Sequence, residues 1–212
     1  MSNSKEVKLA NIDVKTARVF IEGDTDLVLN KMNARCMRML MADDRKGIRE
    51  VPNKWEDIIT AIHWRDGIPC KDTYAECTED LLLDMLKNNA PCITAFGLKK
   101  SFGQAVVRNE IDKNSTKFAN AVNVIATKGI VPVSFTEHFV SEQLMSPKRG
   151  APITVLLNHF TGWKCDFMIS YTDHVYSLEQ IVNIINLAGF GIGIGSGRTS
   201  DYGRYHVVDL QG

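Results

Sequence analysis

Hydrophobic and polar positions follow the most regular pattern in the last third of the chain. The segments ITVLLNHF (153–160) and WKCDFMISY (163–171) flank the turn residues Thr161 and Gly162, a pattern typical of a β-hairpin. One face of the second segment carries Cys165, Phe167, Ile169 and Tyr171, and the other carries Asp166, Met168 and Ser170. We therefore expect two antiparallel strands with one buried face.

A helix and a final strand are predicted after this hairpin. Ser177-x-x-Gln180 forms a capping box ahead of LEQIVNIINLA, and Gly189 stands where a C′ glycine ends a helix. A glycine-rich stretch follows, and YGRYHVVDL closes the chain as a strand.

The first part of the chain predicts a strand from Ala17 to Ile21, a polar turn and then a helix. Four side chains repeat at helical spacing on one side of that helix, namely Val28, Met32, Cys36 and Met39. The opposite side carries Lys31, Arg35 and Arg38.

The middle of the chain predicts three more helices and two short strands. Thr73-x-x-Glu76 precedes the helical segment CTEDLLLDMLKNN, and CITAF reads as a short strand. LKKSFGQAVVRNEI predicts a helix that turns Leu98, Phe102, Ala105 and Val106 inward. A further helix is expected from Ser115 to Lys128, followed by the strand IVPVSF.

Together these elements predict an α+β fold with a largely antiparallel sheet. The expected core is RRM-like or ferredoxin-like, with helical insertions. We expect one domain over residues 1–212, in which 31–130 is a helix-rich insertion and 150–210 holds the hairpin, helix, glycine loop and last strand.

Composition narrows the functional classes only slightly. Lys plus Arg and Asp plus Glu are 25 each, so the net charge does not indicate a polyanionic partner. Five cysteines without a CxxC pair argue against a disulfide framework and a zinc site. The polar first residues lack the pattern of a signal peptide, and no apolar run is long enough to span a membrane. We expect a cytoplasmic protein without a cofactor or metal.

Five glycines fall between Gly189 and Gly197, which raises the question of what approaches this backbone so closely. A Rossmann fingerprint follows a strand and opens a helix, whereas these glycines follow a helix and precede a strand. A P-loop fails for the same reason, since Gly197-Arg198-Thr199 leads into a strand. Two interpretations remain: exposed amides that bind anions beside arginines, or glycines that simply let the chain bend.

The ending resembles the glycine-rich loop of the RAMP superfamily, the repeat-associated proteins of CRISPR systems that bind RNA on ferredoxin-like or RRM-like folds. More closely, it is similar to a family of phage proteins with a RAMP-like ending. The similarity rests on IEGDTDLVLN, APCITAFGLKKSF, Trp163, Ala188-Gly189, Gly193-Ile194-Gly195, Arg198 and Tyr202-Gly203-Arg204-Tyr205. It implies single-stranded nucleic-acid binding, subunits stacked side by side and, for a phage protein, the host cytoplasm. The family usually places a tryptophan and a proline near the loop arginine, where this chain has GSGRTSD.

Charge is unevenly distributed along the chain. Residues 87–128 hold seven Lys or Arg against two acids, whereas residues 51–80 hold seven acids against three bases. Such asymmetry suits a basic groove for nucleic acid or head-to-tail packing of copies, and it is equally typical of solvated helix faces.

The sequence therefore favours a protein that binds single-stranded RNA or DNA and assembles with itself or with related subunits. The residues expected to bind nucleic acid are Gly191, Gly193, Gly195, Gly197, Arg198, Tyr202, Arg204, Tyr205, Lys99, Lys100, Lys31, Arg35 and Arg38. Arg198 and Arg204 would hold phosphates, and Tyr202 or Tyr205 would stack on a base. One alternative is a protein-interaction module that inhibits or mimics a subunit of a host defence complex. Another is a metal-independent ribonuclease of the RAMP type, although none of the five histidines is assigned a catalytic role.

Overall fold

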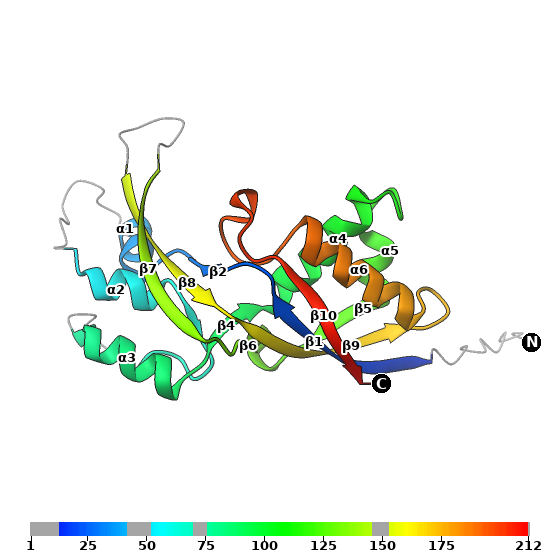
Figure 1. Ribbon diagram of the computed structural model, residues 1–212, viewed down its shortest axis with the longest axis horizontal. Coiled ribbons are helices and arrows are strands. Elements are labelled where there is room, and N and C mark those ends of the chain that lie inside the picture. Colours follow the sequence, from blue (N-terminus) through cyan, green and yellow to red (C-terminus); the bar gives the residue numbers. More distant parts are fainter. Residues whose placement is uncertain (1–12, 42–51, 70–75, 146–152, 212) are drawn as a thin grey trace, which may run out of the picture.

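A four-stranded antiparallel sheet with two helices on one face forms one half of the molecule (Figure 1). The computed structural model describes residues 13–41, 52–69, 76–145 and 153–211. The strands are β1 (Val14–Gly23), β5 (Val122–Ile125), β9 (Lys164–Thr172) and β10 (Tyr205–Gln211), and the helices are α4 (Ala95–Arg108) and α6 (Leu178–Gly191). Their spatial order is β10-β1-β9-β5.

This topology is ferredoxin-like. Along the chain the core runs β1, α4, β5, β9, α6, β10, which is the strand–helix–strand–strand–helix–strand order of that arrangement. In space the first strand lies beside the third and the fourth strand forms an edge. The predicted α+β fold class with a ferredoxin-like core is therefore confirmed.

Two smaller sheets lie beside this core. One has the order β2 (Leu27–Leu29), β8 (Ile153–Thr161), β7 (Glu137–Met145), and the other has the order β3 (His63–Trp64), β4 (Pro91–Thr94), β6 (Ile130–Pro132). Helices α1 (Ala34–Met41), α2 (Lys54–Thr60) and α3 (Glu79–Asn88) gather at the end of the molecule away from α5 (Thr116–Ala121) (Figure 1). Short 3₁₀ turns occupy Thr127–Gly129 and Arg198–Ser200.

The helix predicted from Val28 onward is wrong in its first part. Leu27, Val28 and Leu29 are all buried and pair with β8, so this segment is a strand. An amphipathic helix would have exposed at least one of three successive apolar residues, whereas a strand within the core buries them all. The helix begins only at Ala34, and it buries none of its side chains.

The helix predicted from Ser115 to Lys128 is also too long. α5 ends at Ala121, and Val122 and Val124 then pair with Tyr171 and Ile169 of β9. β-branched side chains pack well on a pleated sheet, which explains why the strand replaces the last helical turns. The range 31–130 thus contributes α4 and β5 to the core and is not an insertion throughout.

The predicted hairpin of residues 153–171 is not formed. β8 pairs with β2 and β7, while β9 pairs with β1 and β5, so the turn at Thr161–Gly162 carries the chain from one sheet to another. Trp163, which is fully buried, anchors this crossing by donating its indole N–H to the carbonyl oxygen of Thr25 at 2.8 Å. The predicted buried face of β9 is confirmed for Cys165, Phe167, Ile169 and Tyr171.

Several local predictions hold. The capping box of Ser177 and Gln180 opens α6, although the left-handed residue after this helix is Gly193 and not Gly189. α4 buries Leu98, Phe102, Ala105 and Val106 as expected. α3 is capped by Thr78, whereas Thr73 lies outside the described residues. Within the described ranges, no helix is both long and apolar enough to cross a membrane.

Candidate nucleic-acid interface

The glycines of the loop after α6 are packed against the protein's own backbone. A Cβ atom at Gly189 would lie 1.9 Å from the carbonyl oxygen of Tyr205, and one at Gly203 would lie 1.9 Å from that of Ile194. At Gly195, where φ is +77°, a Cβ atom would lie 2.5 Å from the carbonyl oxygen of Val28. What approaches these glycines is therefore the chain itself, which brings β10 against α6 and β2 against the loop.

Hydrogen bonds within the protein also engage several amides of the loop. The N–H of Ser196 donates to Val28 O at 2.8 Å, that of Ile194 donates to Gly203 O at 3.0 Å, and that of Gly193 donates to Ala188 O at 2.8 Å. Gly191 is the last residue of α6. The prediction that the amides from Gly191 to Gly197 are free to bind a strand is therefore wrong for Gly193, whose N–H donates within the protein. The loop instead forms a wall.

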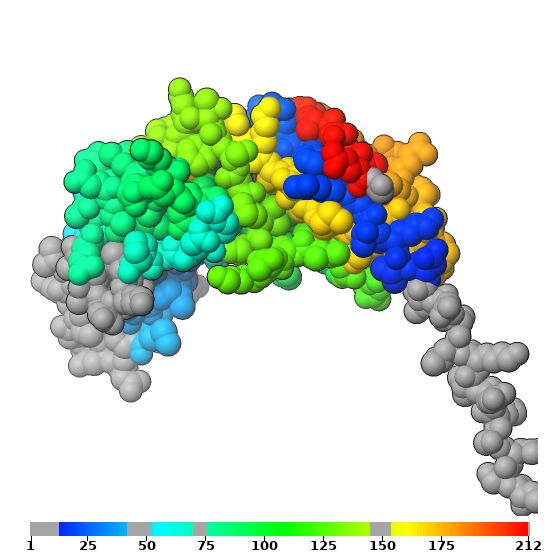
Figure 2. Space-filling view, turned by 90° about the horizontal axis from the view of Figure 1, so that it is seen from below, coloured from blue at the N-terminus to red at the C-terminus, as the bar shows by residue number. Residues whose placement is uncertain are grey.

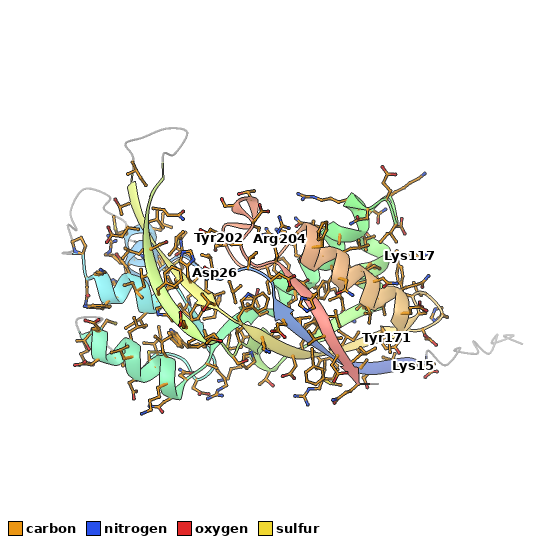
Figure 3. The ribbon with its side chains drawn as sticks, viewed as in Figure 1. Lys15, Asp26, Lys117, Tyr171, Tyr202 and Arg204 are labelled. Carbon is orange, nitrogen blue, oxygen red and sulfur yellow. The ribbon has the colours of Figure 1, made fainter. Side chains whose placement is uncertain are left out.

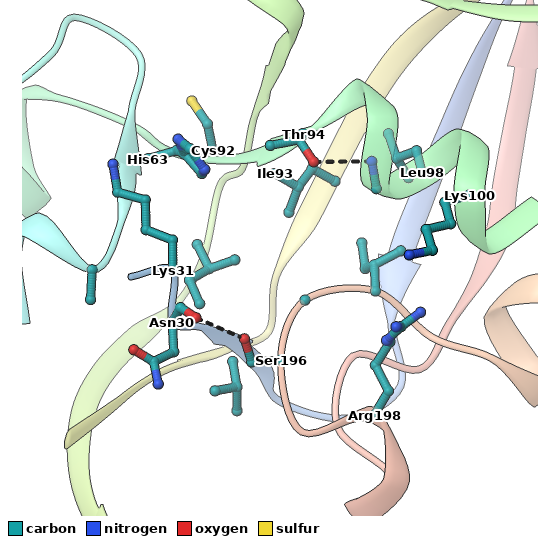
Figure 4. A pocket seen from close by; sticks show the side chains of 16 residues that line it. Asn30, Lys31, His63, Cys92, Ile93, Thr94, Leu98, Lys100, Ser196 and Arg198 are labelled. Carbon is teal, nitrogen blue, oxygen red and sulfur yellow. Dashed lines mark hydrogen bonds between the residues drawn. The ribbon is translucent and has the colours of Figure 1, made fainter. Parts of the chain in front are cut away.

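That wall closes one side of a cavity of about 210 Å³, which we call the cationic pocket (Figure 4). Lys31 enters it from the segment after β2, Lys100 from α4 and Arg198 from the loop. In Figure 4 Lys100 and Arg198 approach each other on one side, and Lys31 lies on the other side beside His63. Leu29, Ile93 and Leu98 supply apolar parts of the lining.

Within the part of the chain that the structure describes, the three cationic groups of the pocket have no carboxylate partner. None of the described residues that line the cavity is acidic, and no described carboxylate lies within 4 Å of these groups. Arg198 donates through Nη1 to the amide oxygen of Gln104 at 3.3 Å, which leaves its charge uncompensated. The side chain of Lys31 is exposed, yet partial desolvation lowers its pKa.

The other titratable groups of the pocket are neutral at pH 7. Burial, and to a lesser extent the charge of Lys31, lower the pKa of His63 below its usual value, so its imidazole is uncharged. Burial raises the pKa of the Cys92 thiol to about 11, so it stays protonated. The positive potential of the cavity therefore comes from Lys31, Lys100 and Arg198.

Two other predicted phosphate ligands, Arg35 and Arg38, form ion pairs. Arg35 binds both carboxylate oxygens of Asp57 at 3.0 and 2.5 Å, and Arg38 donates to Glu56 at 2.6 Å. These pairs attach α1 to α2. Of the predicted stripe, Lys31 therefore lines the pocket, whereas Arg35 and Arg38 have a structural role.

The remaining predicted ligands lie outside the pocket. Arg204 pairs with Asp201 at 2.8 Å, and Lys99 donates to Asn123 at 2.6 Å. Tyr202 is half-buried, with its ring edge-on to His159, and Figure 3 shows it beside Arg204 and close to Asp26. Tyr205 is only 1% exposed, so the prediction that its ring stacks on a base is wrong.

Two cations on the helix-free face of the four-stranded sheet also form ion pairs. This face is seen in Figure 2, where β1 lies between β10 and β9. Arg18 contacts Asp166 at 2.6 Å, and Lys164 contacts Glu22 at 3.1 Å. Exposed pairs of this kind neutralise the local field while contributing little stability. The cationic pocket thus differs from this face in having uncompensated charge.

Four of the thirteen predicted ligands line the pocket together, namely Lys31, Lys100, Gly195 and Arg198. No sequence pattern indicated that His63 and Thr94 line this cavity, because they enter it through long-range pairing of β3, β4 and β6.

Comparisons with known proteins identify structural neighbours only. No protein-family model matches the sequence, and no curated protein is significantly similar to it. One solved structure similar to the chain is "Cryo-EM structure of the Type III-B Cmr-beta bound to cognate target RNA", at 14% identity and a TM-score of 0.45. The match covers 93% of this chain and 60% of that one, so this chain spans less than two thirds of its neighbour. Cmr6 from Pyrococcus furiosus matches at 11% identity and a TM-score of 0.40, covering 93% of this chain and 100% of that one. At this level neither similarity assigns a role to any residue here.

Proposed function

We propose that this protein binds single-stranded nucleic acid, RNA or DNA, with strand phosphates held in the cationic pocket. The observation that carries the proposal is the convergence of Lys31, Lys100 and Arg198 on one cavity without an acidic lining residue among those that the structure describes. Ion pairs neutralise Arg18 and Lys164 on the open sheet face. The pocket is therefore the favoured place for a polyanion.

The geometry suits phosphate recognition from two sides. The Arg198 guanidinium presents a planar fork of donors, whereas the ammonium groups of Lys31 and Lys100 act as mobile point charges. The apolar side chains of Ile93 and Leu98 lie in the same cavity and would contact sugar carbons or base edges. A strand bound this way makes sequence-independent contacts, and its affinity depends on salt.

A binding measurement with a paired variant tests the proposal. We expect fluorescence anisotropy to detect binding of a labelled 12-nucleotide RNA or DNA of mixed sequence at 50 mM salt. The double variant Lys100→Gln/Arg198→Gln should bind at least about tenfold more weakly, because two uncompensated charges are lost at about 1 kcal/mol or more each. Lys87→Gln removes an exposed lysine of α3 outside the pocket and serves as the matched control.

Two outcomes would overturn the proposal. Equal loss in the double variant and in Lys87→Gln would mean that binding does not occur in the pocket. Absence of oligonucleotide binding, together with salt-tolerant binding to a protein partner, would favour the interaction module instead.

The neighbourhood of His63 favours a second candidate function, metal-independent RNA cleavage. A neutral imidazole beside a lysine of lowered pKa can act as general base on a 2′-hydroxyl, while the ammonium protonates the leaving 5′-oxygen. RNA incubated with the protein and a metal chelator would then be cut, and His63→Ala would abolish the cutting. Intact RNA after prolonged incubation would rule this activity out.

Assembly with other copies or with related subunits is also part of the proposal. Light scattering after size-exclusion chromatography, with and without a bound oligonucleotide, measures it directly. A species that stays monomeric under both conditions would remove this part of the proposal while leaving the binding site untouched.

A further inference from the structure

The cationic pocket carries more positive charge than one internal phosphate of a strand can neutralise. A phosphodiester brings one negative charge, whereas Lys31, Lys100 and Arg198 present three positive groups around about 210 Å³. A phosphate monoester carries about 1.5 to 2 negative charges at pH 7 and three strong acceptor oxygens. The charge of the pocket therefore matches a monoester better than a diester.

A larger groove adjoins this small cavity. It has a volume of about 900 Å³ and shares the lining residues Asn30 and Lys31 with the pocket. The groove runs between α1, α2 and the β7–β8 ribbon. Its lining includes Lys54, Met32, Leu156, Glu142 and the ion pair of Arg35 with Asp57. Lys54 lies over the ring of Trp55 with no carboxylate partner among the described residues. A strand that leaves the pocket past Lys31 would enter a groove wide enough for several nucleotides.

Hydrogen bonds between three segments hold the walls of the pocket in place. Ser196 fastens the loop to the β2 segment by bonds to Val28 O at 2.8 Å and Asn30 O at 3.2 Å, and the side chain of Ser101 on α4 bonds Gly193 O at 2.9 Å. Three segments thus fix the walls, so the cavity is built before a ligand arrives, and the cost of ordering it on binding is small.

We propose that the cationic pocket receives the terminal phosphate monoester of a single strand, while the body of the strand lies in the adjoining groove. This inference rests on the proposed function and names the part of the ligand that the site recognises. The same chemistry occurs at a 5′-phosphorylated end and at a 3′-phosphorylated end, which share the monoester group and differ in the direction of the strand.

The test compares RNA 12-mers of one sequence that carry a 5′-phosphate, a 3′-phosphate or two hydroxyl ends, each with the dye attached internally to a base. At 150 mM salt and pH 7.5 we expect one phosphorylated strand to bind at least about tenfold more tightly than the hydroxyl-ended strand. A nucleoside monophosphate of the same end type should displace that strand, whereas the free nucleoside should not.

Variants localise the effect. Arg198→Gln and, independently, Lys100→Gln should reduce the preference for the phosphorylated end to less than about threefold, and Lys87→Gln should retain it. Lys100 is exposed on α4, so its replacement leaves the fold intact even where Arg198→Gln affects the loop.

The possible results separate this inference from the proposed function. Equal binding of all three strands, with affinity still reduced in the pocket variants, would overturn end recognition and leave binding of internal phosphates. A preference that persists unchanged in both variants would also overturn it, because the monoester would then lie elsewhere. Failure of every strand to bind would contradict the proposed function itself.

Discussion

At the scale of single residues, Gly195 shows how close backbone contact builds the candidate site. Its φ of +77° is a conformation that side chains with a Cβ rarely adopt, and an added methyl group would lie 2.5 Å from Val28 O. The contact sets the distance between the loop and the β2 segment, from which Arg198 and Lys31 enter the pocket.

We expect Gly195→Ala to destabilise the protein by about 1–3 kcal/mol, through backbone strain and displacement of the loop. Gly191→Ala is the matched control, since Gly191 has open space where the methyl group would go and is helical. There alanine should be neutral or stabilising by up to about 1 kcal/mol. Urea unfolding of both variants measures the difference, and equal effects would contradict the described packing.

His63 provides a residue-scale test of the pocket's electrostatics. Its pKa is lowered because burial and the neighbouring Lys31 disfavour the charged imidazolium. A bound anion favours the charged form and therefore raises this pKa, so binding takes up a proton and affinity increases as the pH falls.

For a hydroxyl-ended oligonucleotide we expect affinity to increase about three- to tenfold between pH 7.5 and pH 5.5, since one pKa unit corresponds to about tenfold. The informative quantity is the difference in this increase between the unaltered protein and the variant His63→Gln. That variant should lose most of the increase. If His63→Gln and the unaltered protein had the same dependence of affinity on pH, protonation of His63 would not be coupled to binding.

At the scale of elements, α1 is held by polar contacts. None of its side chains is buried, yet Arg35 and Arg38 pair with α2, and the N–H of Ala34 donates to the hydroxyl of Thr60 at 2.9 Å. A short helix without a buried face does not persist by propensity alone. Its position beside the groove therefore depends on these contacts.

Asp57→Ala should release α1 while leaving the core intact, because it leaves the Arg35 guanidinium without its bidentate partner. We expect amide hydrogen exchange over residues 34–41 to accelerate at least about tenfold, which corresponds to about 1.4 kcal/mol. Exchange in β1 should be unchanged in this variant. The control is Glu79→Ala, which removes an exposed carboxylate on α3 and should leave exchange unchanged throughout the chain. Unchanged protection of α1 would mean that other contacts hold this helix.

Patterns of hydrophobic and polar residues identified most helices and strands, because they indicate which face of an element is buried. They did not identify which strands pair with each other. The alternation in Cys165, Phe167, Ile169 and Tyr171 correctly predicted a one-sided strand. The turn residues Thr161 and Gly162 suggested that this strand returns along the preceding one, whereas it pairs with β1 over 140 residues away. Pairing at that separation depends on the whole core, and no short window of sequence encodes it.

At the scale of the whole molecule, the candidate site depends on the same long-range pairings. The sequence placed Lys31, Lys100, Gly195 and Arg198 among the expected ligands through local basic clusters and the glycine loop. It could not separate them from Arg35, Arg38 and Arg204, because the carboxylates that neutralise those arginines are recognised only in three dimensions. A balance of 25 basic and 25 acidic residues therefore conceals a cavity whose three cations have no carboxylate partner among the described residues.

The most direct test of this account is the salt dependence of binding to a hydroxyl-ended single strand. A logarithmic plot of affinity against salt falls by about 0.7 for each phosphate that is neutralised on a single strand. Between 50 and 200 mM salt, we predict a slope shallower by at least about 0.7 units, the share of one phosphate, for the triple variant Lys31→Gln/Lys100→Gln/Arg198→Gln than for the unaltered protein. The same slope and affinity in both proteins would contradict the assignment of phosphate binding to the cationic pocket.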